Sequence, residues 1–198
     1  MSGRVAERSE PKVESRKLKT GSQKAKRLQA KGGEFSMIIR AIIPTDFEDV
    51  DRCVFAAFEN DGEVGLVRQL RADNDVLIEL VAEEARSIVG HVIASNLTLD
   101  PDLGRRCGGL APLSVSPAHQ SSGIGLKLME AIIEKSRSIG LNALFLLGDP
   151  AYYQRFGFQV TDIESEYPAE YFQAYELTPE CLIGAKARAH YARAFSSI

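Results

Sequence analysis

The residues whose types and spacing best suit chemistry lie between Leu113 and Met129. Within this stretch, two glycines occupy the point where a predicted loop becomes a predicted helix, in the run Gln120-Ser121-Ser122-Gly123-Ile124-Gly125. Glycine has no Cβ, so a ligand can approach the backbone closely there. A helix N-terminus has unpaired N–H groups and about half a positive charge, which suits a phosphate or pyrophosphate. The pattern therefore predicts an anion site, although glycines at a helix start can also serve tight packing alone.

The residues around these glycines exclude two common phosphate-binding patterns. A dinucleotide-binding fingerprint needs a third glycine and an acidic residue that closes a later strand, and neither is in the expected place. A P-loop needs Gly-Lys-Ser/Thr, which is missing. The spacing Gln120-x-x-Gly123-x-Gly125 instead resembles the Gln/Arg-x-x-Gly-x-Gly/Ala motif of the GNAT superfamily of acetyl-CoA-dependent N-acetyltransferases.

A second stretch strengthens this resemblance. Residues Tyr153 to Phe158 match the Tyr-x-Arg/Lys-x-Gly-Phe ending common in GNAT proteins, and the longer run from Gly148 to Phe158 resembles the YhbS-type branch. The similarity extends over about residues 37–193. It implies an enzyme that moves an acetyl group from acetyl-CoA to an amine of a small molecule or a protein, by direct attack in a ternary complex. A non-catalytic acyl-CoA-binding or interaction module with the same fold is the alternative.

The resemblance also implies which residues hold the donor. Backbone groups of Leu113, Ser114 and Val115 would bind the pantetheine arm, and the N–H near Val115 would face the thioester oxygen. The amides of the loop would hold the pyrophosphate, namely those of Gln120, Ser121, Ser122, Gly123, Ile124 and Gly125. Asp149 is expected beside the cofactor where many GNAT proteins have Asn, and this change removes a neutral amide partner for the donor.

Tyr153 is the predicted general acid, because it matches the tyrosine that lies near the CoA sulfur in many GNAT proteins. A phenol with a pKa of about 10 is protonated at neutral pH and can give its proton to a leaving thiolate. Two alternatives stay open. The neighbouring Tyr152 could be the acid, or the tyrosines could belong to an aromatic cluster that only packs a short helix on the sheet.

The base is less clearly marked. An alkyl amine has a pKa of about 10.4, so a base or a site that favours the neutral amine is needed. Glu79 is the candidate, because it shares a predicted strand face with Leu77 and Val81, where burial would raise its pKa. The alternatives are a solvated carboxylate at the sheet rim, His91 as the base, or a chain of waters instead of a single base.

The elements that position these residues follow from hydrophobic periodicity. The predicted order is a strand at 37–42, helices near 46–58 and 66–70, strands at 76–82 and 87–95, a loop at 97–108, a strand at 113–116, a helix to Gly140, and strands at 143–147, 172–177 and 185–192. The unbroken apolar run at 143–147 is typical of a strand with parallel pairing. The resulting prediction is a mixed, mostly antiparallel α/β sheet flanked by helices. The resemblance adds a central splayed parallel pair, as in the GNAT fold.

Composition limits the class of protein. The chain has 198 residues, enough for one domain with a sizeable core. Its three cysteines are scattered, which favours a reducing cytoplasm, and its three histidines lack metal-ligand spacing, so no metal is expected. No apolar run reaches the length of a membrane span, so no membrane partner is expected. The oligomeric state, a homodimer included, stays open.

Residues 1–36 differ from residues 37–198, which form the predicted catalytic domain. They contain ten Lys and Arg against four Asp and Glu, whereas the remainder has 14 basic and 23 acidic residues. With almost no large apolar side chains, this segment is predicted to be a disordered tail, or to precede a start at Met37. A basic arm for nucleic acid is the rival hypothesis, and deleting residues 1–36 would test it. The acidic remainder favours a cationic acceptor.

Overall fold

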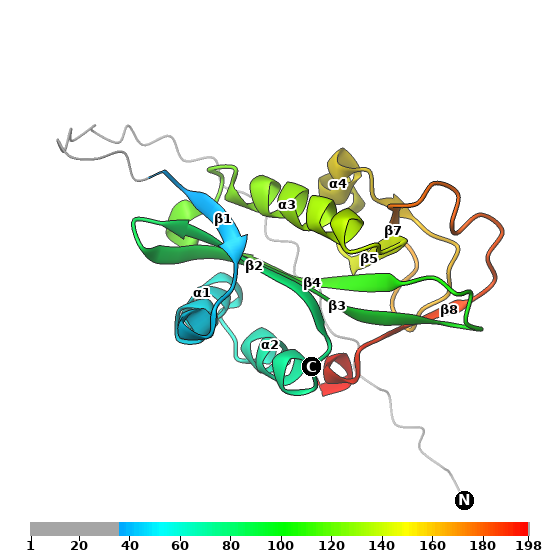
Figure 1. The fold of residues 1–198 in the computed structure, drawn as a ribbon, viewed down its shortest axis with the longest axis horizontal. Coiled ribbons are helices and arrows are strands. Elements are labelled where there is room, and N and C mark those ends of the chain that lie inside the picture. Colours follow the sequence, from blue (N-terminus) through cyan, green and yellow to red (C-terminus); the bar gives the residue numbers. More distant parts are fainter. Residues whose placement is uncertain (1–35, 198) are drawn as a thin grey trace, which may run out of the picture. The chain divides into compact units, whose positions relative to one another are not determined.

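The computed structural model describes residues 36–197, so the predicted basic tail lies outside the described residues except for Ser36. The described part contains one eight-stranded sheet in the order β1-β2-β3-β4-β5-β7-β6, with β8 paired to β3 (Figure 1). The strands are β1 (Ile38–Ala41), β2 (Val76–Glu84), β3 (Ser87–Asp100), β4 (Cys107–Val115), β5 (Ala143–Leu147), β6 (Gln159–Val160), β7 (Phe172–Glu176) and β8 (Arg188–Tyr191). Within residues 36–197, no helix is long and apolar enough to cross a membrane.

Helices cover both faces of the sheet (Figure 1). They are α1 (Phe47–Phe58), α2 (Gly62–Ala72), α3 (Ile124–Ser138) and α4 (Pro150–Tyr153). The apolar stripe of α3 packs on one face, where it meets buried side chains of β2, β3 and β4. The stripes of α1 and α2 pack on the opposite face, against Val81 and Ile93. Buried apolar clusters on both faces therefore hold the sheet between two helical layers, as the apolar periodicity of each helix requires.

The strands β4 and β5 form a V. They run parallel, but their pairing covers only Cys107–Gly109 with Ala143–Phe145. All other strand pairs in the sheet are antiparallel. Beyond Gly109, β4 stays paired to β3 on its other edge, with a register shift opposite Val92 and Ala94. The predicted mixed α/β fold with a central splayed parallel pair is confirmed.

The predicted loop from Leu97 to Gly108 is too long at both ends. The strand β3 continues to Asp100, and β4 begins at Cys107. The additional length of β3 is stabilised by β8, because Leu97 to Asp100 pair with Tyr191 to Arg188. A pairing between segments about 90 residues apart leaves no local signal in the sequence, so periodicity alone ends the strand too early.

Two glycines, Gly108 at the end of the predicted loop and Gly109 after it, lie inside β4. A Cβ atom at Gly108 would lie 3.1 Å from Leu144 Cδ2, and one at Gly109 would overlap the ring of Tyr191. Glycine is therefore needed at Gly109 for close approach of a side chain rather than for a turn. Gly109 is also the last residue of β4 that pairs with β5, so this contact lies where the two strands begin to diverge.

Candidate active site

A groove of about 580 Å³ opens where the two arms of the V diverge. It is bounded by the end of β4, the loop and first turn of α3, and the segment of α4 that continues to Arg155. Most of the predicted cofactor-binding residues line it, namely Leu113, Val115, Gln120, Ser121, Gly123, Ile124 and Gly125. The structure thus brings together two motifs that are about 30 residues apart in the sequence.

The loop before α3 presents a run of free backbone donors. In the described part of the chain, no protein acceptor is hydrogen-bonded to the N–H groups from Ser121 to Leu126. Gly123 is the N-cap of α3 with φ of +88°, a left-handed conformation that favours glycine, and the space around it is open. Six consecutive N–H groups at the start of a 15-residue helix can bind an anion through hydrogen bonds and the helix dipole.

Gly90 of β3 determines how closely this loop approaches the sheet. A Cβ atom at Gly90 would lie 2.9 Å from both Ile124 Cγ2 and Leu128 Cδ1. The first turn of α3 therefore rests directly on the backbone of β3. On the groove side, a Cβ at Gly125 would lie 3.2 Å from Tyr152 Oη and 3.7 Å from Val115 Cγ2. The anion loop, β4 and α4 consequently meet around Gly125.

The short helix α4 supplies two aromatic side chains to the groove. Both Tyr152 and Tyr153 line the groove, and their rings meet edge to face with centroids 4.9 Å apart. The ring of Tyr153 lies against Gly148, where a Cβ would overlap it. Burial, together with Tyr152, raises the pKa of the Tyr153 phenol to about 12, so this hydroxyl keeps its proton at neutral pH. Its predicted role as general acid stays a prediction.

Arg155 is a groove residue that the motif contains but that we did not predict as a ligand-binding residue. Its guanidinium lies 4.7 Å from the centroid of the Tyr152 ring, a cation–π contact that holds the charge at the groove wall. An arginine beside a run of free N–H groups adds the charge that phosphate recognition favours. Its position in the Tyr-x-Arg-x-Gly-Phe motif was the feature of the sequence from which a role in ligand binding could have been predicted.

Three predicted cofactor-binding residues do not line the groove. Ser114 is buried on the other side of β4, where its hydroxyl lies 3.5 Å from the His91 carbonyl. The Ser122 hydroxyl donates to the His119 carbonyl. Asp149 is exposed and caps α4, since its Oδ1 accepts a hydrogen bond of 2.9 Å from the Ala151 N–H. Cofactor contacts of these residues stay predictions, and for Asp149 the helix cap is the role that the structure shows.

Glu79 lies under α2 in a buried polar cluster, not at a solvated rim. Its Oε1 lies 2.8 Å from His91 Nε2, and its Oε2 lies 3.1 Å from Arg71 Nε. Glu79 is 7% exposed and His91 is fully buried. Burial alone would raise the pKa of Glu79, but the hydrogen bonds from His91 and Arg71 outweigh burial and lower it. The expected upward shift is therefore wrong, because periodicity showed the burial but not the partners.

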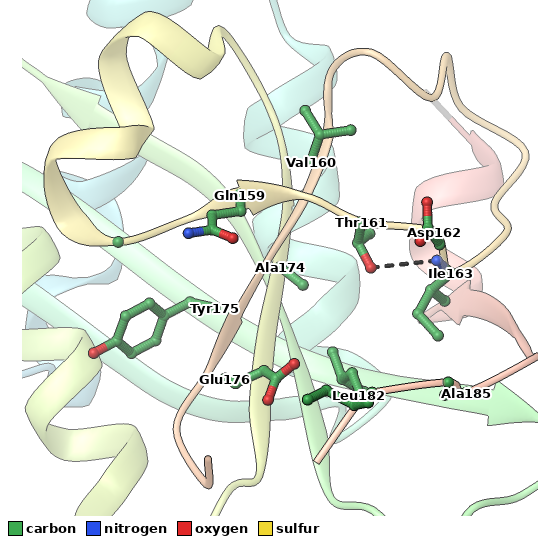
Figure 2. Close-up of a pocket in the computed structure, with 13 residues that line it drawn as sticks. Gln159, Val160, Thr161, Asp162, Ile163, Ala174, Tyr175, Glu176, Leu182 and Ala185 are labelled. Carbon is green, nitrogen blue, oxygen red and sulfur yellow. Dashed lines mark hydrogen bonds between the residues drawn. The ribbon is translucent and has the colours of Figure 1, made fainter. Parts of the chain in front are cut away.

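A second hollow of about 540 Å³ lies between β6, β7 and the segment before β8 (Figure 2). It shares no lining residue with the groove at the V. Two carboxylates, Asp162 and Glu176, stand in its wall, which disfavours a phosphate-bearing ligand. Among the described residues, no group of three or more His, Cys, Asp or Glu side chains is arranged to hold a metal ion.

Known proteins share this fold and much of this sequence. The model of the acetyltransferase (GNAT) family matches residues 38–158. The uncharacterized N-acetyltransferase YhbS of Escherichia coli K12 is 30% identical over 166 residues, which cover 81% of this chain and 99% of that protein. The crystal structure of Escherichia coli YhbS in complex with CoA superimposes with a TM-score of 0.78 at 29% identity, covering 85% of this chain and 96% of that one.

A second solved structure supports the same grouping. It is a GNAT family acetyltransferase from Brucella melitensis in complex with acetyl-CoA, with a TM-score of 0.71 and 33% identity. The match covers 82% of this chain and 99% of that chain. With a family model that spans more than half of its length and a relative that matches nearly end to end, this chain belongs to the acetyltransferase (GNAT) family.

Proposed function

We propose that this protein transfers an acetyl group from acetyl-CoA to an amine of a small molecule or a protein, by direct attack in a ternary complex. The observation that carries the proposal is the run of free N–H groups from Ser121 to Leu126 at the mouth of the V formed by β4 and β5. Two family members with 29% and 33% identity were crystallised with CoA and with acetyl-CoA, respectively.

The donor would lie along the V with its pyrophosphate on the loop before α3. The free N–H groups and the α3 dipole would hold the phosphate oxygens, and Arg155 would add a charged contact from the opposite wall. Beyond Gly109, the edge of β4 that faces β5 is not paired to it, so its backbone groups can bind the amides of the pantetheine arm. The predicted contacts of Leu113, Ser114 and Val115 belong to this edge.

Tyr153 would donate its phenolic proton to the leaving sulfur. As the amine nitrogen bonds to the carbonyl carbon, the carbon–sulfur bond breaks and the sulfur takes the phenolic proton. A phenol whose pKa is about 12 is a weaker acid than an exposed tyrosine, so the buried site must also raise the basicity of the thiolate for this step to be efficient.

Glu79 would orient His91, and His91 would be the general base that takes the proton of the amine. The carboxylate can only accept hydrogen bonds, so the His91 Nε2 at 2.8 Å must carry the donated proton. In the neutral imidazole, Nδ1 is then the acceptor, and this buried atom has no hydrogen-bond partner among the described residues. An orienting carboxylate with a free imidazole nitrogen is the arrangement of a general base. The proton of the amine would reach Nδ1 through water, because His91 is fully buried.

The test of the proposal is binding followed by turnover. Acetyl-CoA or CoA at about 100 times its dissociation constant should stabilise the fold by about 2.7 kcal/mol, seen as a rise in Tm. Thiol release from acetyl-CoA would then be measured against a panel of amines, polyamines, amino acids and peptides. A protein whose Tm ignores millimolar CoA is not an acetyl-CoA enzyme, and binding without turnover across the panel would favour a non-catalytic acyl-CoA-binding module.

A matched pair of variants localises the binding. In Gly123→Asp, a carboxylate enters the anion loop and should abolish the Tm response to CoA. Gly104→Asp is the control, because Gly104 also has a positive φ, of +65°, and open space around it, but it lies in the loop between β3 and β4. Both variants bear similar backbone strain. Equal CoA responses in the two variants would place the pyrophosphate elsewhere.

A further inference from the structure

The turn between β5 and α4 determines where the proposed acid lies. The ring of Tyr153 rests on Gly148, the first residue of this turn, so closely that a Cβ atom at Gly148 would overlap it. The same ring meets Tyr152 and Phe158 edge to face, with centroids 4.9 and 6.1 Å away. A group that fixes the backbone of Gly148 therefore also helps to fix the Tyr153 ring at the wall of the groove.

The backbone ladder between β5 and β7 stops at this turn. The two strands pair up to Leu147, and the Gly148 N–H still donates to the Tyr171 carbonyl at 3.0 Å. In a continued antiparallel ladder, the Gly148 carbonyl would accept the Tyr171 N–H in return. That N–H instead donates to the Pro168 carbonyl at 3.1 Å. The Gly148 carbonyl thus loses its backbone partner at the point where α4 is about to begin.

The side chain of Gln173 replaces the missing backbone bond. Its Nε2 donates to the Gly148 carbonyl at 2.8 Å, with a longer contact of 3.5 Å to the Tyr171 carbonyl. Gln173 is fully buried, and its Oε1 has no hydrogen-bond partner among the described residues. Because a buried oxygen without a partner lowers stability, the gain from this side chain lies in the Nε2 bond.

Strand pairing supports the turn from one side only. On the β4 side, pairing of β5 ends at Phe145, so the edge that follows opens into the V. On the other side, β7 runs along β5 as far as Leu147 (Figure 1). The amide of Gln173 therefore attaches the turn to β7 just beyond the last paired residue of β5.

We propose that Gln173 is a positioning residue for acetyl transfer: its amide holds Gly148 so that the Tyr153 hydroxyl meets the sulfur of the bound donor. This inference rests on the proposed function. Gln173 is not among the residues that line the groove, so it would act through the turn and not on the donor itself. Without its bond, the half-buried Gly148 would turn its carbonyl to water, and the start of α4 would move with it. A misplacement of about 1 Å can lower a rate about 10²-fold.

The experiment is a double-mutant cycle with a matched control. Gln173→Met keeps the length of the side chain and removes its donor. Gln159→Met is the control, because it makes the same change at an exposed position on the neighbouring strand β6. Both changes are made in wild type and in Tyr153→Phe. Thiol release from acetyl-CoA, with an acceptor found for wild type, gives turnover, and the CoA dissociation constant and Tm are measured for each protein.

The expected result is a loss of turnover that depends on Tyr153. In the wild-type background, Gln173→Met should lower turnover about 10- to 10²-fold. Its CoA dissociation constant should change less than about twofold, because the loop before α3 is untouched. In the Tyr153→Phe background, Gln173→Met should change turnover less than about twofold, because no proton donor is left to misplace. Gln159→Met should match its parent in both backgrounds.

The outcomes that would overturn the inference are distinguishable. If Gln173→Met turns over as fast as Gln159→Met, or loses the same factor in both backgrounds, Gln173 is a packing residue and the proposed function stands. If Tyr153→Phe itself turns over like wild type, there is no acid to position, and the inference falls with that role. If wild type releases no thiol with any acceptor, the inference and the proposed function fail together.

Should Gln173→Met not fold, the same bond can be weakened from its other end. An α-hydroxy acid with the side chain of Asp149 turns the peptide bond after Gly148 into an ester, whose carbonyl is a weaker acceptor. Every side chain is kept, and the N–H that is lost at Asp149 has no acceptor among the described residues. This protein should show a fall in turnover with an unchanged CoA dissociation constant, and unchanged turnover would contradict the inference.

Discussion

Replacing Glu79 by Gln removes one negative charge from the buried cluster under α2 and nearly preserves the volume of the side chain. Arg71 and His91 would lose the carboxylate that they contact at 3.1 and 2.8 Å. Because Arg71 cannot lose its proton, the variant leaves a partly buried positive charge with only the more distant carboxylate of Asp51, 3.9 Å away. Breaking such a pair costs about 3–5 kcal/mol of unfolding free energy. For a domain of this size, that corresponds to a fall in Tm of about 6–20 °C.

The assay is urea and thermal unfolding beside a matched control on the same strand. Glu83→Gln removes a carboxylate that pairs with Arg40 at 2.8 Å, but its side chain is 24% exposed, against 4% for Glu79. A pair of this kind contributes at most about 1 kcal/mol. If Glu79→Gln costs no more than Glu83→Gln, the reasoning that Glu79 is a buried, paired charge is refuted.

The pH dependence of the same variant provides an independent test. The pKa of Glu79 is lower in the folded state than in the unfolded chain, where it is about 4.3. The unfolded state therefore binds more protons in the window between these values, so this contribution to stability is complete above about pH 5 and is lost as the pH falls through the folded-state pKa. Glu79→Gln should remove this part of the acid dependence, and an unchanged slope would contradict the shift.

Three further predictions concern the V. Arg155→Gln should weaken CoA binding by removing a charged phosphate contact, with a smaller dependence of affinity on salt than in wild type; titration of CoA at two ionic strengths measures both. Tyr153→Phe should reduce turnover about 10²- to 10⁴-fold with an unchanged dissociation constant for CoA, and unchanged turnover would leave Tyr153 as a packing residue. Gly109→Ala should lower the unfolding free energy by about 1–3 kcal/mol, because the new methyl group overlaps the Tyr191 ring; an unfolding curve that matches wild type would show that the ring can move away freely.

Sequence periodicity was sufficient to predict a helix or strand where that element buries one continuous face. The helices α1 and α3 and the strands β2 and β5 follow from local patterns. Periodicity was insufficient where partners distant in the sequence determine the structure. The extension of β3 to Asp100 depends on β8, and Gly109 leaves room within β4 for the ring of Tyr191. Neither contact has a local signature.

The candidate site shows the same division between local and distant information. Motif spacing predicted an anion site at the loop from Gln120 to Gly125, and most of these residues line the groove, because the course of the loop depends on a few adjacent backbone groups. It did not identify the partners of Glu79, since Arg71 comes from α2 and His91 from β3. It also gave no sign of the contact between Tyr191 and Gly109, because only the folded chain brings β8 close to β4. A groove wall formed by one loop could be predicted from the sequence, whereas a cluster shared among several elements could not.

The proposed reaction places opposite electrostatic demands on one small region. An anionic donor must bind to a domain that has 14 basic and 23 acidic residues beyond residue 36, so net charge cannot attract it. Local dipoles from Ser121 to Leu126 and the Arg155 guanidinium can, because they act at contact distance. The acidic remainder favours a cationic amine but also favours its protonated, unreactive form. The negative charge that would attract a cationic amine therefore also makes a base necessary to remove its proton. This is the physical reason for giving the free Nδ1 of His91 a place in the mechanism.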